Sequence, residues 1–113
     1  MSRKVLILDD DYSFACNVIN NNATGNMSFS VADSLNRARM MMKNESYDLI
    51  LANTKVPGGS SYSLKDELSS HSPATRMIFM SALDKEFEAI SSLGERCIRK
   101  NEIYNKESNI FEK

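Results

Sequence analysis

Polar side chains capable of chemistry follow four short apolar runs in this chain. They are the aspartates Asp9, Asp10 and Asp11, the amide Asn53, the hydroxyl Ser81 and the ammonium Lys100. A carboxylate can act as a nucleophile or bind a hard cation, because its oxygens are anionic. A carboxamide is a poor nucleophile and carries no charge, so Asn53 is the unexpected member of the set.

The apolar runs predict strands of a parallel sheet. Val5–Leu8, Leu49–Ala52 and Met77–Met80 are continuously apolar, which is typical of strands buried on both faces. Met27–Ala32 alternates between apolar and small polar residues, and Cys97–Ile98 has an arginine on each side, so these two suit the edges. We therefore predict an α/β fold, a (βα)5 flavodoxin-like three-layer sandwich whose five parallel strands have the order 2-1-3-4-5.

Segments with helical periodicity lie between and after these strands. The predicted helices run from Tyr12 to Asn20, from a cap at Asp33 or Ser34 to Met42, through Leu64 and Leu68, from Asp84 to Leu93 before Gly94 and, more weakly, from Ile103 to Phe111. In such folds binding sites form at the carboxyl ends of the strands, near the switch between strands one and three. The polar residues after the strands are therefore predicted to converge on one pocket.

The composition indicates a globular domain without a large field of one charge. The chain has 113 residues, of which 42% are hydrophobic and 26% charged, and its net charge is −1. We expect one domain over residues 1–113, no direct binding to nucleic acid, and no membrane segment or secretion signal, because the apolar runs are short. Cys16 and Cys97 are far apart in sequence and are expected to be free thiols in a reducing, cytoplasmic compartment.

Four segments together resemble the receiver domain of two-component response regulators. They are "VLILDDD", "YDLILANTKVPGG", "MIFMSA" and "CIRK", in this order along the chain. The resemblance implies that an acidic pair, here Asp9 and Asp10, binds Mg²⁺, and that Ser81 and Lys100 contact a phosphoryl group. The aspartate that accepts phosphate from a histidine kinase in the family corresponds to Asn53.

Asn53 and three further departures from the family predict a receiver that has lost phosphoacceptance. Cys97 stands where the family has an aromatic switch residue, and Asn101 stands where the family has the proline after its lysine. Ser60-Ser61 replaces the family's Asp-Gly turn. Without a carboxylate at position 53 the pocket loses an anionic ligand, so we expect Mg²⁺ binding to be weak and no cofactor to be required.

Lys55 is a candidate replacement for the metal. In the family, the residue two positions after the acceptor gives its backbone carbonyl to the metal ion, and its side chain lies near the pocket. A lysine at this position leads to the hypothesis that its ammonium group lies near Asp9 and Asp10 in place of a cation.

Each of these residues also has an ordinary structural interpretation. Asp11 is expected to cap the first helix, where a carboxylate suits the helix dipole. Taken singly, Ser81 could be a turn hydroxyl and Lys100 a solvated surface lysine. Asn53 could bond a neighbouring loop. For the first two aspartates we favour the pocket.

The predicted function is that of a non-enzymatic signalling domain that works without phosphorylation. It would bind another signalling protein or an effector domain, or form a homodimer, through the face that helix four, strand five and helix five provide in the family. Candidate anchors on this face are Ile103, Tyr104 and Phe111. One alternative is a working phosphorelay receiver in which Asn53 is an engineered substitution. Another is a flavodoxin-like domain for a small ligand, although three aspartates after the first strand would repel an anionic cofactor.

Overall fold

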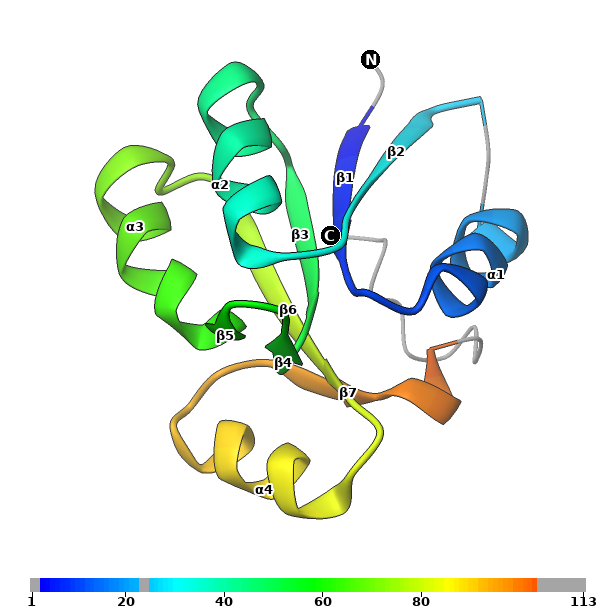
Figure 1. The fold of residues 1–113 in the computed structure, drawn as a ribbon, viewed down its shortest axis with the longest axis vertical. Coiled ribbons are helices and arrows are strands. Elements are labelled where there is room, and N and C mark those ends of the chain that lie inside the picture. The colour runs from blue at the N-terminus through cyan, green and yellow to red at the C-terminus, as the bar shows by residue number, and fades with distance from the viewer. Residues whose placement is uncertain (1–2, 23–24, 104–113) are drawn as a thin grey trace.

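The computed structural model describes residues 3–22 and 25–103. Its main sheet has five parallel strands in the order β2-β1-β3-β6-β7, which confirms the predicted topology (Figure 1). The strands are β1 (Arg3–Leu8), β2 (Met27–Ala32), β3 (Leu49–Asn53), β6 (Arg76–Ser81) and β7 (Cys97–Arg99). The three continuously apolar runs form the centre, and the two strands with polar residues form the edges, as predicted.

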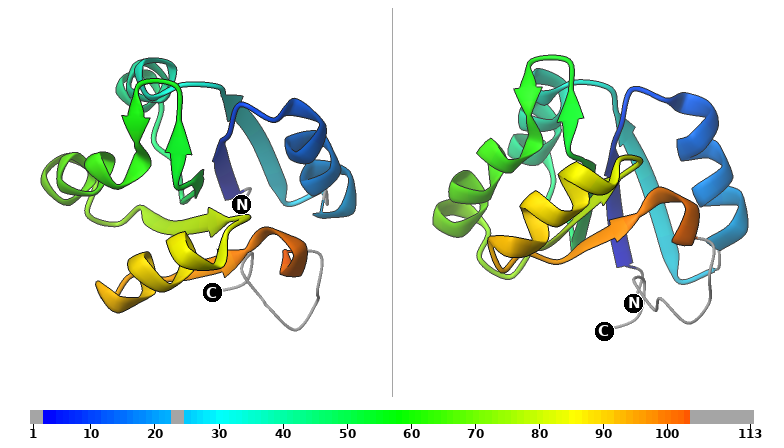
Figure 2. Two further views of the ribbon diagram at one scale, coloured as in Figure 1. Left: turned by 60° about the horizontal axis from the view of Figure 1, so that its bottom comes forward. Right: turned by 90° about the horizontal axis from the view of Figure 1, so that it is seen from below.

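Four α-helices cover the two faces of this sheet (Figures 1 and 2). They are α1 (Tyr12–Asn22), α2 (Leu35–Asn44), α3 (Leu64–His71) and α4 (Asp84–Ser92). Successive strand residues point to opposite faces, so Val5 and Ile7 pack with α1, whereas Leu6 and Leu8 pack with α2 and α3. Both faces of the central strands are therefore buried, and the result is a sandwich of three layers.

The helix ends follow from the local sequence. Asp11 Oδ1 accepts a hydrogen bond from the Phe14 amide at 3.0 Å at the start of α1, as predicted. Ser34, one of the two predicted caps, accepts a hydrogen bond from the Arg37 amide at 3.1 Å at the start of α2. Gly94 follows α4 with a φ of +82°, a conformation that suits glycine after a helix.

A small hairpin links β3 to α3. It pairs β4 (Lys55–Val56) with β5 (Gly59–Ser60) and leads into a 3₁₀ turn, Ser61–Ser63. The sequence predicts the turn but not the two short strands. Gly58 has a φ of +105°, and a Cβ added there would lie 3.2 Å from the Leu35 Cβ of α2, so both backbone geometry and close packing require glycine.

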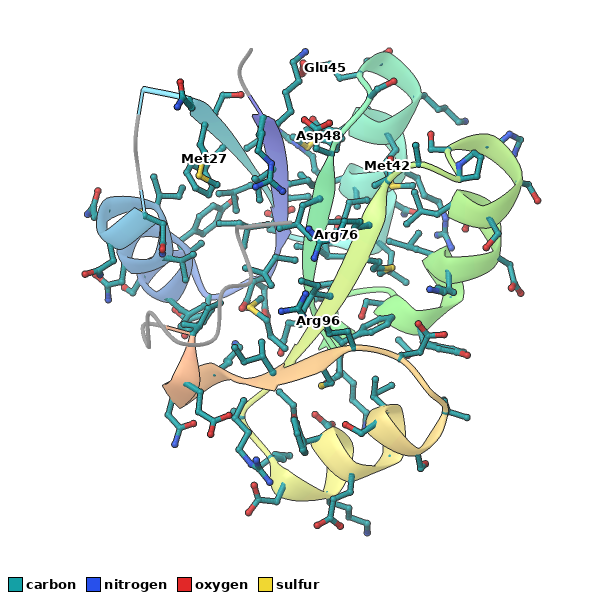
Figure 3. All side chains as sticks on the ribbon, turned by 180° about the vertical axis from the view of Figure 1, so that it is seen from behind. Met27, Met42, Glu45, Asp48, Arg76 and Arg96 are labelled. Atoms are coloured by element: carbon teal, nitrogen blue, oxygen red, sulfur yellow. The ribbon has the colours of Figure 1, made fainter. Side chains whose placement is uncertain are left out.

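The amino ends of the strands carry a separate set of charged residues. Asp48 precedes β3 and Arg76 begins β6, and the Arg76 amide donates a 3.0 Å hydrogen bond to the Asp48 carbonyl (Figure 3). Because the strands are parallel, this edge lies opposite the carboxyl ends where the predicted site residues gather.

The segment after β7 is described only in part. A 3₁₀ turn, Lys100–Glu102, follows the strand and ends at Ile103. The predicted last helix otherwise falls outside the described residues. Within residues 3–22 and 25–103, no helix combines the length and the apolar character needed to cross a membrane.

Candidate functional site

A buried ion pair joins the carboxyl ends of β1 and β7. Asp9, directly after β1, is fully buried, and Lys100 Nζ lies 2.8 Å from its Oδ2. The contact is an ion pair rather than an aligned hydrogen bond, while Asp9 Oδ1 accepts a 3.0 Å hydrogen bond from the Asp11 amide. The Lys100 ammonium also lies 4.5 Å from the centre of the Phe14 ring, where the π electrons attract a cation. A buried carboxylate needs its charge paired, and here the protein itself supplies the cation.

The other two aspartates do not enter this cluster. Asp10, predicted to pair with Asp9, is exposed, and Asp11 is exposed at the start of α1, where it caps the helix. Asp10 is therefore not part of the buried ion pair, and its role in a metal site stays a prediction. Helix α1 begins at Tyr12, and of the three carboxylates that precede it only Asp9 is buried.

Asn53 closes the loop that follows β3. Its side chain is half-buried, and its Nδ2 donates a 2.8 Å hydrogen bond to the backbone carbonyl of Lys55. An ionised aspartate could not make this bond, because a carboxylate only accepts hydrogen bonds. The bonded carbonyl is the one that the resemblance assigns to the metal ion. This contact agrees with the structural role considered for Asn53 from the sequence, in which its side chain bonds a neighbouring loop.

Ser81 and Thr54, the residue after Asn53, both lie next to the carboxylate of Glu86 in α4. The Ser81 hydroxyl is buried, accepts a hydrogen bond from the Leu83 amide at 3.0 Å and donates one to the Leu83 carbonyl at 2.7 Å. The same hydroxyl oxygen lies 3.4 Å from Glu86 Oε1. The hydroxyl of Thr54, a buried residue, donates a 2.6 Å hydrogen bond to this Glu86 oxygen. Both hydroxyls are therefore engaged with α4 and the loop before it.

The hypothesis that Lys55 supplies a cation to the aspartates is wrong. Its side chain is 79% exposed, and its Nζ lies 3.6 Å from Glu86 Oε2. Neighbouring residues of a strand point to opposite sides, and since Val56 is buried in the core, Lys55 points outward. Lys100 is the cation beside Asp9.

Of the three candidate interface anchors, the structure describes Ile103 alone. Ile103 is 2% exposed and packs in the core cluster that contains Val5 and Ile7 of β1. The prediction of an exposed anchor is wrong for Ile103, because the turn after β7 brings its side chain onto the sheet. Tyr104 and Phe111 lie outside the described residues.

Cys97 occupies the position that the family gives to an aromatic residue. Its half-buried side chain packs against the core under α2–α4. Burial raises the pKa of the Cys97 thiol, and the negative charge of Glu86 adds to this rise, while a backbone hydrogen bond with Ile98 and the charge of Arg99 oppose it. The thiol is therefore a weak nucleophile at neutral pH.

The groups at the strand ends do not fit Mg²⁺. Within residues 3–22 and 25–103, no cluster of three or more His, Cys, Asp or Glu side chains could hold a metal ion. An ammonium group already neutralises Asp9, and Asn53 directs its amino group, not an anionic oxygen, at the Lys55 carbonyl. Mg²⁺ prefers anionic oxygen ligands in octahedral geometry, and this arrangement lacks them.

A shallow cavity lies beside these residues. Its volume is about 230 Å³, and it is lined by Ser81, Ala82, Asp84, Arg99, Lys100 and Asn101. Two of the predicted site residues, Ser81 and Lys100, therefore line one cavity, whereas Asp9 and Asn53 are not in its lining.

The sequence interpretation did not include Thr54 and Glu86. Glu86 is the third residue of α4, and an acidic residue in a first turn is usually explained by the helix dipole. Only the packing of α4 beside the β3–β4 loop distinguishes Glu86 from the other acidic residues of this helix.

Several solved structures have the same fold, and they are response regulators. The RcsB response regulator of Salmonella typhimurium is 13% identical with a TM-score of 0.79, and the match covers 97% of this chain and 58% of that one. A Burkholderia pseudomallei response regulator with a phosphorylated aspartic acid and a calcium ion is 15% identical with a TM-score of 0.79, covering 96% of this chain and 65% of that one. The receiver domain of the Francisella response regulator 1452 is 22% identical with a TM-score of 0.72, covering 94% and 99%.

These likenesses establish that the chain has the receiver fold. The chain spans less than two thirds of the length of the Salmonella and Burkholderia proteins. No family model and no curated protein sequence matches the chain.

Proposed function

We propose that this chain is a receiver-like signalling domain of a two-component response regulator that works without phosphorylation. Residues 1–113 would form a single, non-enzymatic domain in the cytoplasm. The domain would act by binding another signalling protein, an effector domain or a second copy of itself, in signal transduction or transcription control.

The observation that carries this proposal is the hydrogen bond from Asn53 Nδ2 to the Lys55 carbonyl, at 2.8 Å. The residue at the acceptor position uses an N–H donor that an ionised aspartate lacks, and it offers neither a nucleophile nor an anionic metal ligand. The ion pair of Lys100 with Asp9 supports the same conclusion, because it neutralises the buried carboxylate without a metal ion.

The Burkholderia response regulator shows what the fold supports in another protein, since it holds a phosphorylated aspartic acid. An acyl phosphate forms when a carboxylate oxygen attacks phosphorus and the phosphodonor's leaving group departs with the bonding electrons. A carboxamide at position 53 of this chain cannot follow that course.

The test is to incubate the protein with Mg²⁺ and a small phosphodonor and to measure the intact mass under acidic conditions. We expect wild type to gain no phosphate. Asn53→Asp restores the nucleophile, and a gain of one phosphate in this variant alone would show that the missing carboxylate is what prevents phosphorylation of wild type.

Asn21→Asp provides a matched control. Asn21 lies on α1, and its Nδ2 also donates a 2.8 Å hydrogen bond to a backbone carbonyl, that of Asn17. The control exchanges the same groups away from the strand ends, so it should remain unlabelled. Stoichiometric phosphate on wild type would refute the proposal.

For the partner surface we propose the face that includes α4 and β7. Two large apolar side chains flank α4, Leu83 at 60% and Leu93 at 57% exposure. Exposed apolar side chains beside a helix suit a protein-binding surface. Sedimentation equilibrium over a concentration series tests the homodimer, and Leu83→Glu together with Leu93→Glu should shift any dimer toward monomer.

A further inference from the structure

Helix α4 makes few apolar contacts with the rest of the protein. None of its residues is buried, and within the described chain its main apolar contact with the core is the half-buried Ile90. By contrast, α2 buries Leu35 and Ala38, and α3 buries Leu64 and Leu68. The small apolar contribution means that polar contacts must supply much of the attachment of α4, which lies beside β7 in Figure 2.

Beside the 2.9 Å ion pair of Asp84 with Arg99 of β7, three polar contacts of α4 converge on the carboxylate of Glu86. Its Oε1 accepts the 2.6 Å hydrogen bond of Thr54 and lies 3.4 Å from the Ser81 hydroxyl, while its Oε2 lies 3.6 Å from Lys55 Nζ. The three partners come from two separate segments, the loop after β3 and the end of β6. One side chain of α4 therefore connects the helix to two strand ends at once.

The environment makes the Thr54 contact the strongest of the three. Thr54 is 5% exposed and the Glu86 side chain 23% exposed, so the bond is largely protected from water. A hydroxyl that donates to a carboxylate makes a charge-assisted hydrogen bond, about twice as strong as a neutral one. The Lys55 pair contributes less, because an exposed ion pair adds little.

Thr54 is itself held firmly in place. Its amide donates to the Met80 carbonyl at 3.1 Å, and its carbonyl accepts the Ser61 amide at 3.0 Å and lies 3.3 Å from the Ser61 hydroxyl. The hydroxyl that reaches Glu86 therefore projects from backbone that is bonded on both sides. A rigid donor loses little entropy when it bonds α4.

We propose that Glu86 is the positioning residue that fixes α4 on the carboxyl ends of β3 and β6, so that the α4 surface is held in one arrangement without a phosphoryl group. The consequence for signalling rests on the proposed function, whereas the anchoring of α4 does not. In this arrangement a carboxylate of the protein, rather than an added phosphate, accepts the hydrogen bond of the Thr54 hydroxyl and lies next to Ser81.

Hydrogen exchange of the α4 amides under native conditions tests the anchor. Glu86→Ala should speed exchange of the amides from Phe87 to Ser92 by roughly 10- to 100-fold, as expected for the loss of a hydrogen bond to a charged group. Amides of α2 should change by less than about 3-fold, because local opening of α4 does not require global unfolding.

Glu88→Ala is the matched control, since Glu88 lies exposed on the same helix. It changes the same residue type with the same gain in helix propensity, and it should leave α4 exchange nearly unchanged. Glu86→Gln keeps an oxygen acceptor for Thr54 and should restore part of the protection, because the neutral acceptor makes the weaker hydrogen bond. Thr54→Val removes the donor while keeping its shape, and in combination with Glu86→Ala it should add little, because both remove the same bond.

Equal α4 exchange in Glu86→Ala and Glu88→Ala would overturn the proposal, and so would full additivity of Thr54→Val with Glu86→Ala. If Glu86→Ala unfolds, the comparison of Thr54→Val with wild type decides the question alone. The phosphodonor assay is separate: labelled wild type with a released α4 in Glu86→Ala would refute phosphorylation independence and leave the anchor standing. Unlabelled wild type with unchanged α4 exchange in Glu86→Ala would refute the anchor and leave phosphorylation independence standing.

Discussion

Lys100→Met removes the cation from the buried Asp9 carboxylate. Methionine keeps most of the length of the lysine stem and can still contact the Phe14 ring through its sulfur, so the lost group is mainly the charge. Asp9 is 0% exposed and the Lys100 side chain 16% exposed, so the remaining carboxylate has little access to water.

Removing one partner of a buried ion pair costs about 3–5 kcal/mol, and the residual exposure of Lys100 places the expected loss at about 3–4 kcal/mol. The unfolding entropy is about 2.1 cal/mol/K per residue. Over 113 residues it amounts to about 0.24 kcal/mol/K, so the Tm should fall by roughly 13–17 °C. Urea denaturation followed by circular dichroism measures the free energy of unfolding, and an unchanged m-value would show that the two proteins unfold between comparable states.

Lys4→Met is the matched control. Lys4 Nζ lies 3.0 Å from Glu45 Oε1, nearly the same distance, but both side chains are 47% exposed. This exposed pair should contribute at most about 1 kcal/mol. Asp9→Asn combined with Lys100→Met removes both charges and should recover much of the loss. Equal losses in Lys100→Met and Lys4→Met would refute the reasoning that burial makes the Asp9 ion pair essential.

Three further predictions test the core, the thiols and the hairpin. Ile103→Ala should lower the free energy of unfolding by about 2–4 kcal/mol, because the side chain is 2% exposed in the core, and a loss below about 0.5 kcal/mol on urea denaturation would contradict this packing. Cys97 should react with a maleimide more slowly than the exposed Cys16 at neutral pH, because burial raises the pKa of its thiol. Its reaction rate should increase as the pH rises, and equal rates for the two thiols in mapped alkylation would count against this. Gly58→Ala should destabilise the protein by about 1 kcal/mol or more, since φ is +105° and the added Cβ meets α2, whereas Gly25→Ala, with open space around it, should not; thermal unfolding compares the two.

The topology was accessible from sequence because it depends on patterns that burial imposes. Strands covered on both faces must be apolar throughout, and edge strands can carry polar residues, so Val5–Leu8 and Met27–Ala32 differ in a way that can be recognised. Helix caps are equally local, since Asp11 and Ser34 bond amides only three residues away. The hairpin that begins at Lys55–Val56 was not predicted, because a strand of two residues is too short to show a periodic pattern.

The candidate site was accessible only in outline. Residues that follow parallel strands lie at one edge of the sheet, and this predicts that Asp9 and Lys100 approach each other. Whether the side chain of Asp10 is buried depends on where α1 begins. The direction of the Lys55 side chain depends on which side of a two-residue strand faces the core. Such choices are made by packing and not by residue type.

The sequence by itself determined the parallel sheet and the loss of the carboxylate at position 53, because an amide cannot become a carboxylate in any fold. Only the tertiary structure decided what replaced the missing chemistry. Lys100 rather than Lys55 neutralises Asp9, Asn53 holds the Lys55 carbonyl, and Glu86 receives the hydroxyl of Thr54. The Asn53 contact is local, but Lys100 and Asp9, like Glu86 and Thr54, are far apart in sequence. Each of these two pairs meets only when packing brings its elements together and burial requires its polar groups to find partners.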